Sequence, residues 1–138
     1  NPDKLTPLQG HSIFGVITGL LLILRYLNIK LRGAPAPANS EGSKMNRIAT
    51  LAHKLIYVLI IAVIGTGVAM AVEADFASIF AGTQMMPDSF KHLTTRSAHG
   101  ILTKLLVLVL LAHIGAALYH QFILKDQLLR RMGWKRFS

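Results

Sequence analysis

The sequence predicts an all-α integral membrane protein built as a bundle of transmembrane helices. Three apolar runs each approach or exceed the roughly 20 residues needed to cross a hydrocarbon core. The composition agrees, because 52% of the 138 residues are hydrophobic, only 15% are charged and the mean hydropathy is +0.47. The basic residues gather beside the apolar runs, as they do in membrane proteins. We expect a single membrane domain covering residues 1–138.

The three apolar runs define the expected helices. They cover about residues 12–31, 48–72 and 99–124. Between the first two, the segment 33–46 contains two prolines, Asn, Ser and Gly, which is typical of a turn-rich polar linker. Between the last two lies the more polar segment 73–98. Within it, residues 76–80 are apolar enough to rest at the membrane interface as a short amphipathic piece.

The positions of Lys and Arg predict the orientation, because positive residues are retained on the cytoplasmic side. Two regions are strongly basic: the linker with its flanks, and the tail 125–138. We therefore expect both to be cytoplasmic, and the N-terminus to lie outside. The first residues lack an initiator Met and any signal-like segment. An outer N-terminus without a signal segment needs an explanation, and we expect a preceding transmembrane helix, from the same gene or from another subunit, to provide it.

The residue types present restrict the chemistry. The chain has no cysteine, which excludes disulfides, iron–sulfur clusters and covalent haem attachment. Any redox cofactor must therefore be held non-covalently, by His or Met. The net charge of +9 and the pI near 10.4 do not indicate a nucleic-acid partner, since the basic residues are not interleaved with aromatic ones.

Two histidines in the third run carry most of the functional information. His99 and His113 are fourteen residues apart, which on an α-helix is a rise of about 21 Å and a rotation to within roughly 40° of the starting direction. They share one face but are too far apart to hold one ion. With the expected topology, His11 can meet His99 near the outer side, while His53 and His113 share the inner half, which allows a second site there. Neutral imidazole is a common axial ligand of haem iron. The pattern is thus that of a di-haem membrane cytochrome, and two His ligands per iron favour electron transfer over oxygen binding.

Structural roles compete with haem ligation at each of these histidines. His113 alone would suit an interhelical hydrogen bond, and His99 alone would suit an interfacial position. His53 has the alternatives of being hydrated or of bonding a quinone or a haem propionate. His120 follows His113 by seven residues, so we expect it at the interface, with a substrate or propionate contact as the alternative.

Two further features of the first run admit two interpretations. Arg25 follows His11 by fourteen residues, and it either reaches to the inner headgroups or neutralises a propionate of the inner haem. Gly15 and Gly19 form a G-x-x-x-G pattern, which indicates either close helix packing or space for a flat porphyrin.

The chain resembles the bacterial di-haem cytochrome b-561 proteins, which include the membrane superoxide oxidase. The shared motifs are His11-Ser-Ile-Phe-Gly with Arg25, His53-Lys-Leu-Ile-Tyr57, Gly65-Thr-Gly67, His99, His113 and the ending from His120-Gln-Phe-Ile-Leu-Lys125-Asp126 to Met132. The resemblance covers nearly the whole chain and implies four helices, with His11, His99 and His113 as haem ligands. The family's first helix, which supplies a histidine to the inner haem, is missing here. The second ligand of the inner haem is therefore either a histidine of that helix or His53.

These residues and the resemblance predict one or two haems b that move electrons across the bacterial inner membrane. The expected exchange is between an outer-face redox partner and the quinone pool. Superoxide is one candidate at the outer end, where Lys91 and Arg96 would attract an anion, and whether the protein is an enzyme stays open. The alternatives are a haem-b anchor subunit of a larger oxidoreductase and a His-based metal-ion carrier. The expected partners are membrane lipid, quinone, a further transmembrane helix or subunit and the outer-face redox partner.

Overall fold

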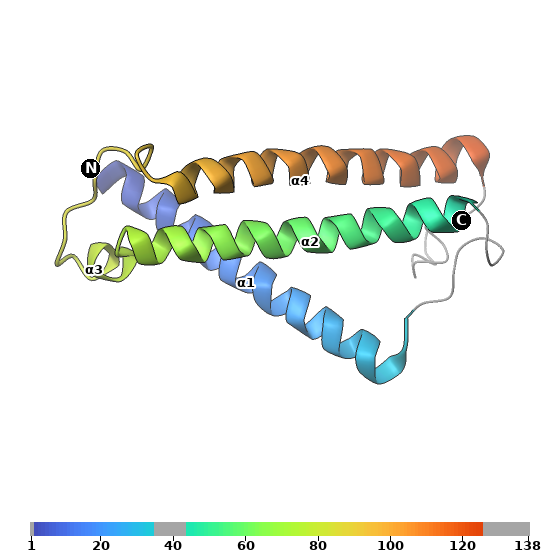
Figure 1. Ribbon diagram of the computed structural model, residues 1–138, viewed down its shortest axis with the longest axis horizontal. Coiled ribbons are helices and arrows are strands. Elements are labelled where there is room, and N and C mark those ends of the chain that lie inside the picture. The colour runs from blue at the N-terminus through green and yellow to red at the C-terminus, as the bar shows by residue number, and fades with distance from the viewer. Residues whose placement is uncertain (1, 35–43, 126–138) are drawn as a thin grey trace. The chain divides into compact units, whose positions relative to one another are not determined.

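The structure is a computed structural model that describes residues 2–34 and 44–125 (Figure 1). Its elements are α1 (Pro2–Arg32), α2 (Lys44–Glu73), α3 (Phe76–Phe80), α4 (Thr94–Tyr119) and a π-helical segment, His120–Leu124. Within the described residues there is no strand, and three helical segments are long and apolar enough to cross a membrane. The predicted all-α membrane bundle is confirmed. Linker residues 35–43 and tail residues 126–138 lie outside the described part of the chain.

Each long helix begins earlier than the apolar run that predicts it. The expected starts were residues 12, 48 and 99, whereas α1 begins at Pro2, α2 at Lys44 and α4 at Thr94. In α1 the extra turns begin with Pro2 and carry Asp3, and both residue types favour a helix start. An apolar run marks the part of a helix that suits the hydrocarbon core, while backbone hydrogen bonding continues into the polar interface. His11, His53 and His99 consequently lie at least one turn inside their helices.

The chain divides into two compact units, which are described separately. The first contains residues 1–34 and 59–103, and the second contains 35–58 and 104–138. In the first unit, α1 packs against the later part of α2, where a Cβ built on Gly19 would lie 3.7 Å from Cδ1 of Ile64. Nothing described lies within 4 Å of the same position on Gly15. Of the two glycines in the G-x-x-x-G pattern, Gly19 is therefore the packing position, and Gly15 faces open space.

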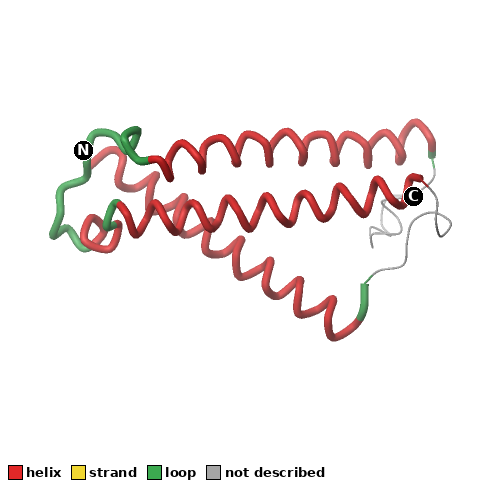
Figure 2. Tube along the Cα trace, in the orientation of Figure 1, coloured by secondary structure: helices red, strands yellow, loops and turns green. Residues whose placement is uncertain are grey.

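Four of the five buried side chains of the described residues gather near the end of α2 and in the connection from α2 to α4, which Figure 2 draws with α3 and its loops. Met70, Phe76, Ile79 and Leu93 form one cluster, and Ile79 is only 2% exposed. Leu5 and Leu8 of α1 pack against this cluster. We call the four buried residues and the segment 74–93 around them the cap. It joins three helices of the first unit through contacts that are shielded from water.

Three hydrogen bonds hold the cap and its flanking residues in place. Asp75 adopts a left-handed conformation with φ of 50°, and its side chain accepts from the backbone N–H of Ser78, which caps the start of α3. The Lys4 ammonium donates to the carbonyl oxygen of Asp88 at 2.8 Å. The hydroxyl of Thr95 donates to the carboxylate of Glu73. The predicted apolar piece at 76–80 is thus a short capped helix.

The transmembrane helices expose their apolar side chains. Phe14 is 71% exposed, Leu31 84% and Val72 77%. Side chains of this kind along whole helices would form very large apolar patches in water. Lipid is the medium that covers them at no cost, since hydrocarbon chains are as apolar as leucine.

Candidate functional site

The first unit brings together the two histidines predicted to form an outer pair. His11 comes from α1 and His99 from α4, and their ring centroids are 5.9 Å apart with the ring planes at 89°. His99 is half-buried, whereas His11 is exposed. Counting residues along two expected helices was enough to predict this meeting, although the residues are 88 positions apart in sequence.

Two polar atoms of helix α2 hold the His99 ring. Nδ1 of His99 lies 2.9 Å from the carbonyl oxygen of Val63 and 3.1 Å from Oγ1 of Thr66. A carbonyl oxygen only accepts, so the short contact to Val63 requires the ring proton to be on Nδ1. Nε2 then keeps its lone pair. Metal-binding imidazoles commonly donate their other N–H to a backbone carbonyl in this way.

Gly67 makes room for the same ring. A Cβ built on Gly67 would lie 3.3 Å from Cε1 of His99 and 3.5 Å from its Nδ1. The imidazole therefore occupies the space that a side chain at residue 67 would need. The sequence pattern alone assigns no role to Val63, Thr66 or Gly67. The only available signal was the Gly65-Thr66-Gly67 run of small residues within an apolar stretch of the helix.

The second unit brings together the histidines predicted for the inner half. Here His53 of α2 and His113 of α4 have ring centroids 5.0 Å apart and ring planes at 64° (helices in Figure 1). His113 is half-buried and His53 is exposed. His120 is half-buried in the π-helical segment, with its ring 6.3 Å from that of Tyr119. Arg25 is exposed on α1, and its role at an inner haem stays a prediction.

One iron between two imidazoles requires a defined distance between the two ring centres. Each metal–nitrogen bond is about 2 Å and each ring adds about 1 Å, so the ring centres should be about 6 Å apart. The outer pair, at 5.9 Å, fits this spacing. The inner pair, at 5.0 Å, is closer, and its rings would have to separate by about 1 Å to hold iron.

The donor set also fits haem. Among the described residues, no group of three or more His, Cys, Asp or Glu side chains is arranged to hold a metal ion. Each histidine pair offers two nitrogens, whereas a zinc site uses three or four protein ligands. Haem iron needs only the two axial ligands from the protein, because the porphyrin supplies the other four.

A positive charge lies beside the outer pair. Arg96 is one helical turn before His99, and a Cβ built on Gly100 would be 2.9 Å from Nη1 of Arg96. The guanidinium therefore lies over Gly100, one turn further along α4, which has no side chain to displace it. Arg96 is exposed, so its charge is available to an anionic group next to the histidines.

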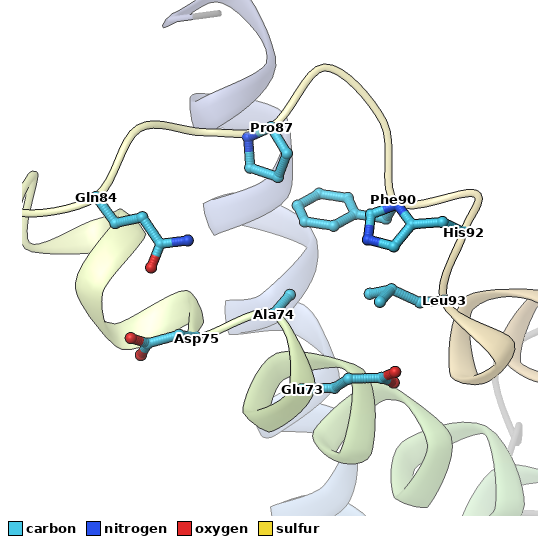
Figure 3. A pocket seen from close by; sticks show the side chains of 8 residues that line it. All are labelled: Glu73, Ala74, Asp75, Gln84, Pro87, Phe90, His92 and Leu93. Atoms are coloured by element: carbon cyan, nitrogen blue, oxygen red, sulfur yellow. The ribbon is translucent and has the colours of Figure 1, made fainter.

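A small pocket of about 280 Å³ opens in the cap (Figure 3). Ala74, Phe90 and Leu93 form part of its apolar lining, and the carboxylates of Glu73 and Asp75 lie at its edge with His92. His92 is exposed. The negative edge suits a neutral or positively charged group better than an anion.

The sequence was compared with known families, curated proteins and solved structures. A sequence model of the prokaryotic cytochrome b561 family matches residues 2–135, which include all three membrane helices and both histidine pairs. No curated protein and no solved structure gave a match. Non-covalent b-type haem agrees with a chain that has no cysteine and two paired imidazole sites. The chain therefore belongs to the prokaryotic cytochrome b561 family, a membership that indicates haem-based electron transfer across a membrane.

Proposed function

We propose that this protein moves electrons across the bacterial inner membrane between an outer-face redox partner and the quinone pool. In this proposal His11 and His99 hold an outer haem b, and His113 holds an inner one. The observation that carries it is the outer pair, whose 5.9 Å spacing suits one iron and whose His99 presents Nε2 as a free lone pair. Bound haem would supply a centre that takes up and releases one electron at a time.

The inner haem needs a second ligand besides His113. His53 is one source, and its ring centroid 5.0 Å from that of His113 supports a place near the inner haem. A further transmembrane helix, from the same gene or from another subunit, is the other source. In that case His53, with Arg25 and His120, would contact haem propionates or quinone.

Superoxide is the outer-face partner that we propose to test first. Each superoxide anion would lose one electron and become O₂, and two such electrons with two protons would convert a quinone to a quinol. Arg96 supports this choice, because its exposed guanidinium lies beside the outer pair and would attract an anion. Lys91 adds a second exposed positive charge on the same outer segment.

A haem-b anchor subunit is a second candidate. Its support is the cap, which has a core of its own and a pocket of about 280 Å³ edged by Glu73 and Asp75. A peripheral dehydrogenase docking there would deliver electrons, and the chain would catalyse nothing alone. A metal-ion carrier has less support, because two-nitrogen sites are too small a donor set for tetrahedral Zn²⁺.

The test begins with a reduced-minus-oxidised spectrum and haem quantitation of the purified full-length protein. A low-spin b-type spectrum supports the cytochrome, and absence of haem refutes it. Superoxide is then supplied with a soluble quinone, and the rate of haem reduction is followed. Rapid reduction that slows at least several-fold in Arg96→Gln, with dithionite reduction unchanged, supports superoxide as donor. If dithionite reduces the haem and superoxide does not, the result favours the anchor subunit.

A further inference from the structure

The hydroxyl group of Thr66 contacts three polar atoms, and their chemistry settles where its proton goes. Oγ1 lies 2.8 Å from the carbonyl oxygen of Ala62, 3.0 Å from that of Val63 and 3.1 Å from Nδ1 of His99. A hydroxyl has one proton and two lone pairs. Since Nδ1 already carries a proton for the Val63 carbonyl, the hydroxyl donates to the carbonyl oxygens of the preceding turn, of which that of Ala62 is the nearer. A lone pair of Oγ1 then faces the imidazole N–H.

We propose that Thr66 is a positioning residue for His99, which helps the Val63 carbonyl to hold the ring proton on Nδ1 and strengthens Nε2 as a donor to iron. This inference rests on the proposed function. Two acceptors, the Val63 carbonyl and the Thr66 oxygen, polarise one N–H. An imidazole polarised in this way is a more basic ligand, and a more basic ligand stabilises the ferric state over the ferrous one. Thr66 thereby lowers the reduction potential of the outer haem.

A purely local role is the alternative, because a threonine in an apolar helix commonly bonds to the carbonyl one turn earlier. Thr18 on α1 shows that role, with its Oγ1 2.8 Å from the carbonyl oxygen of Phe14. No described ring nitrogen contacts Thr18 in the hydrogen bonds of this structure. Thr18→Val is therefore a matched control that removes the same helical hydroxyl away from the histidines.

The test compares Thr66→Val, Thr66→Ser and Thr18→Val in the full-length protein by redox titration of the haems. We expect Thr66→Val to keep its haem and to raise the potential of the outer haem. Thr66→Ser, which restores the hydroxyl, should return toward the wild-type potential, and Thr18→Val should not change it. A wild-type potential in Thr66→Val, or an equal shift in Thr18→Val, overturns the inference.

Nitrogen-15 NMR of histidine in the haem-free chain gives a second readout. We expect the Nδ1–H tautomer at His99 in the wild-type chain and a larger share of Nε2–H in Thr66→Val. If Thr66→Val loses its haem, the share of the Nε2–H tautomer becomes the deciding measurement for the role of Thr66. An unchanged share overturns the inference. A wild-type chain without haem would refute the proposed function, whereas the tautomer measurement would still judge the role of Thr66.

Discussion

Substituting Gly67 by Ala should weaken the outer haem site selectively. The new Cβ would lie 3.3 Å from Cε1 of His99, while relaxed carbon–carbon contacts are about 3.5–4.0 Å. The ring must therefore move away from α2 by a few tenths of an ångström. The Nδ1 contact to the Val63 carbonyl would lengthen from 2.9 Å toward about 3.2 Å, the upper end of good hydrogen-bond geometry. Mild overpacking of this kind costs about 1 kcal/mol, or roughly a fivefold loss of haem affinity.

Gly65→Ala is the matched control for this change. It adds the same methyl group to the same helix two residues earlier, where nothing described lies within 4 Å. Both substitutions gain the same intrinsic helix stability of about 0.5–1 kcal/mol. The difference between them therefore isolates the contact with the His99 ring.

The assay measures the rate at which haem transfers to an excess of a haem-scavenging protein. A His113→Ala background confines the measurement to the outer pair. Gly67→Ala should lose haem roughly fivefold faster than the background protein, and Gly65→Ala should stay close to it. Equal rates in the two variants would refute the argument that residue 67 and His99 compete for space.

Four further outcomes are expected. Acid-acetone should extract all the haem, since the chain has no cysteine to bind it covalently, and haem left on the protein would contradict the assignment. His99→Ala should remove only the outer haem and His113→Ala only the inner one, whereas loss of both from a folded variant would argue against two separate sites. Reporter fusions should place Ser138 in the cytoplasm and Thr83 outside, and the opposite pattern would overturn the assigned sides. Ile79→Ala should destabilise the cap by about 2–5 kcal/mol, seen as faster hydrogen exchange confined to that region, and unchanged exchange would show that the cluster does not hold it.

The sequence was sufficient to predict the helices and the pairs of histidines. An apolar run must become a helix in a bilayer, because each backbone group has to be bonded within its own segment. Once topology is assumed, depth follows from counting residues, and this paired His11 with His99 and His53 with His113. The predicted helix starts were wrong because hydropathy identifies only the part of a helix that suits the hydrocarbon core. It does not identify the polar turns that precede this part, such as those containing Pro2 and Thr94.

The surroundings of His99 were beyond the reach of such counting. Whether Val63, Thr66 or Gly67 faces the ring depends on how α2 is rotated about its own axis, and residues 59–72 of α2 are apolar on every side except at Thr66. Its composition therefore does not mark one face as the inner one. The cap core was missed for a different reason. The sequence marks residues 76–80 as apolar, but the more polar segment around them gives no sign that Ile79 packs against Leu93 and the start of α1.

The cap also bears on the order in which the protein is assembled. Leu5 and Leu8 are made early, but the cluster they pack against is complete only when Leu93 has been synthesised. Contacts between residues so distant in sequence form late, since a long stretch of chain must be closed first. We expect α1 to enter the membrane as a separate span and to pack against the cap afterwards. His11 then meets His99 only after this packing, so a cofactor held by that pair would be inserted among the last steps of biogenesis.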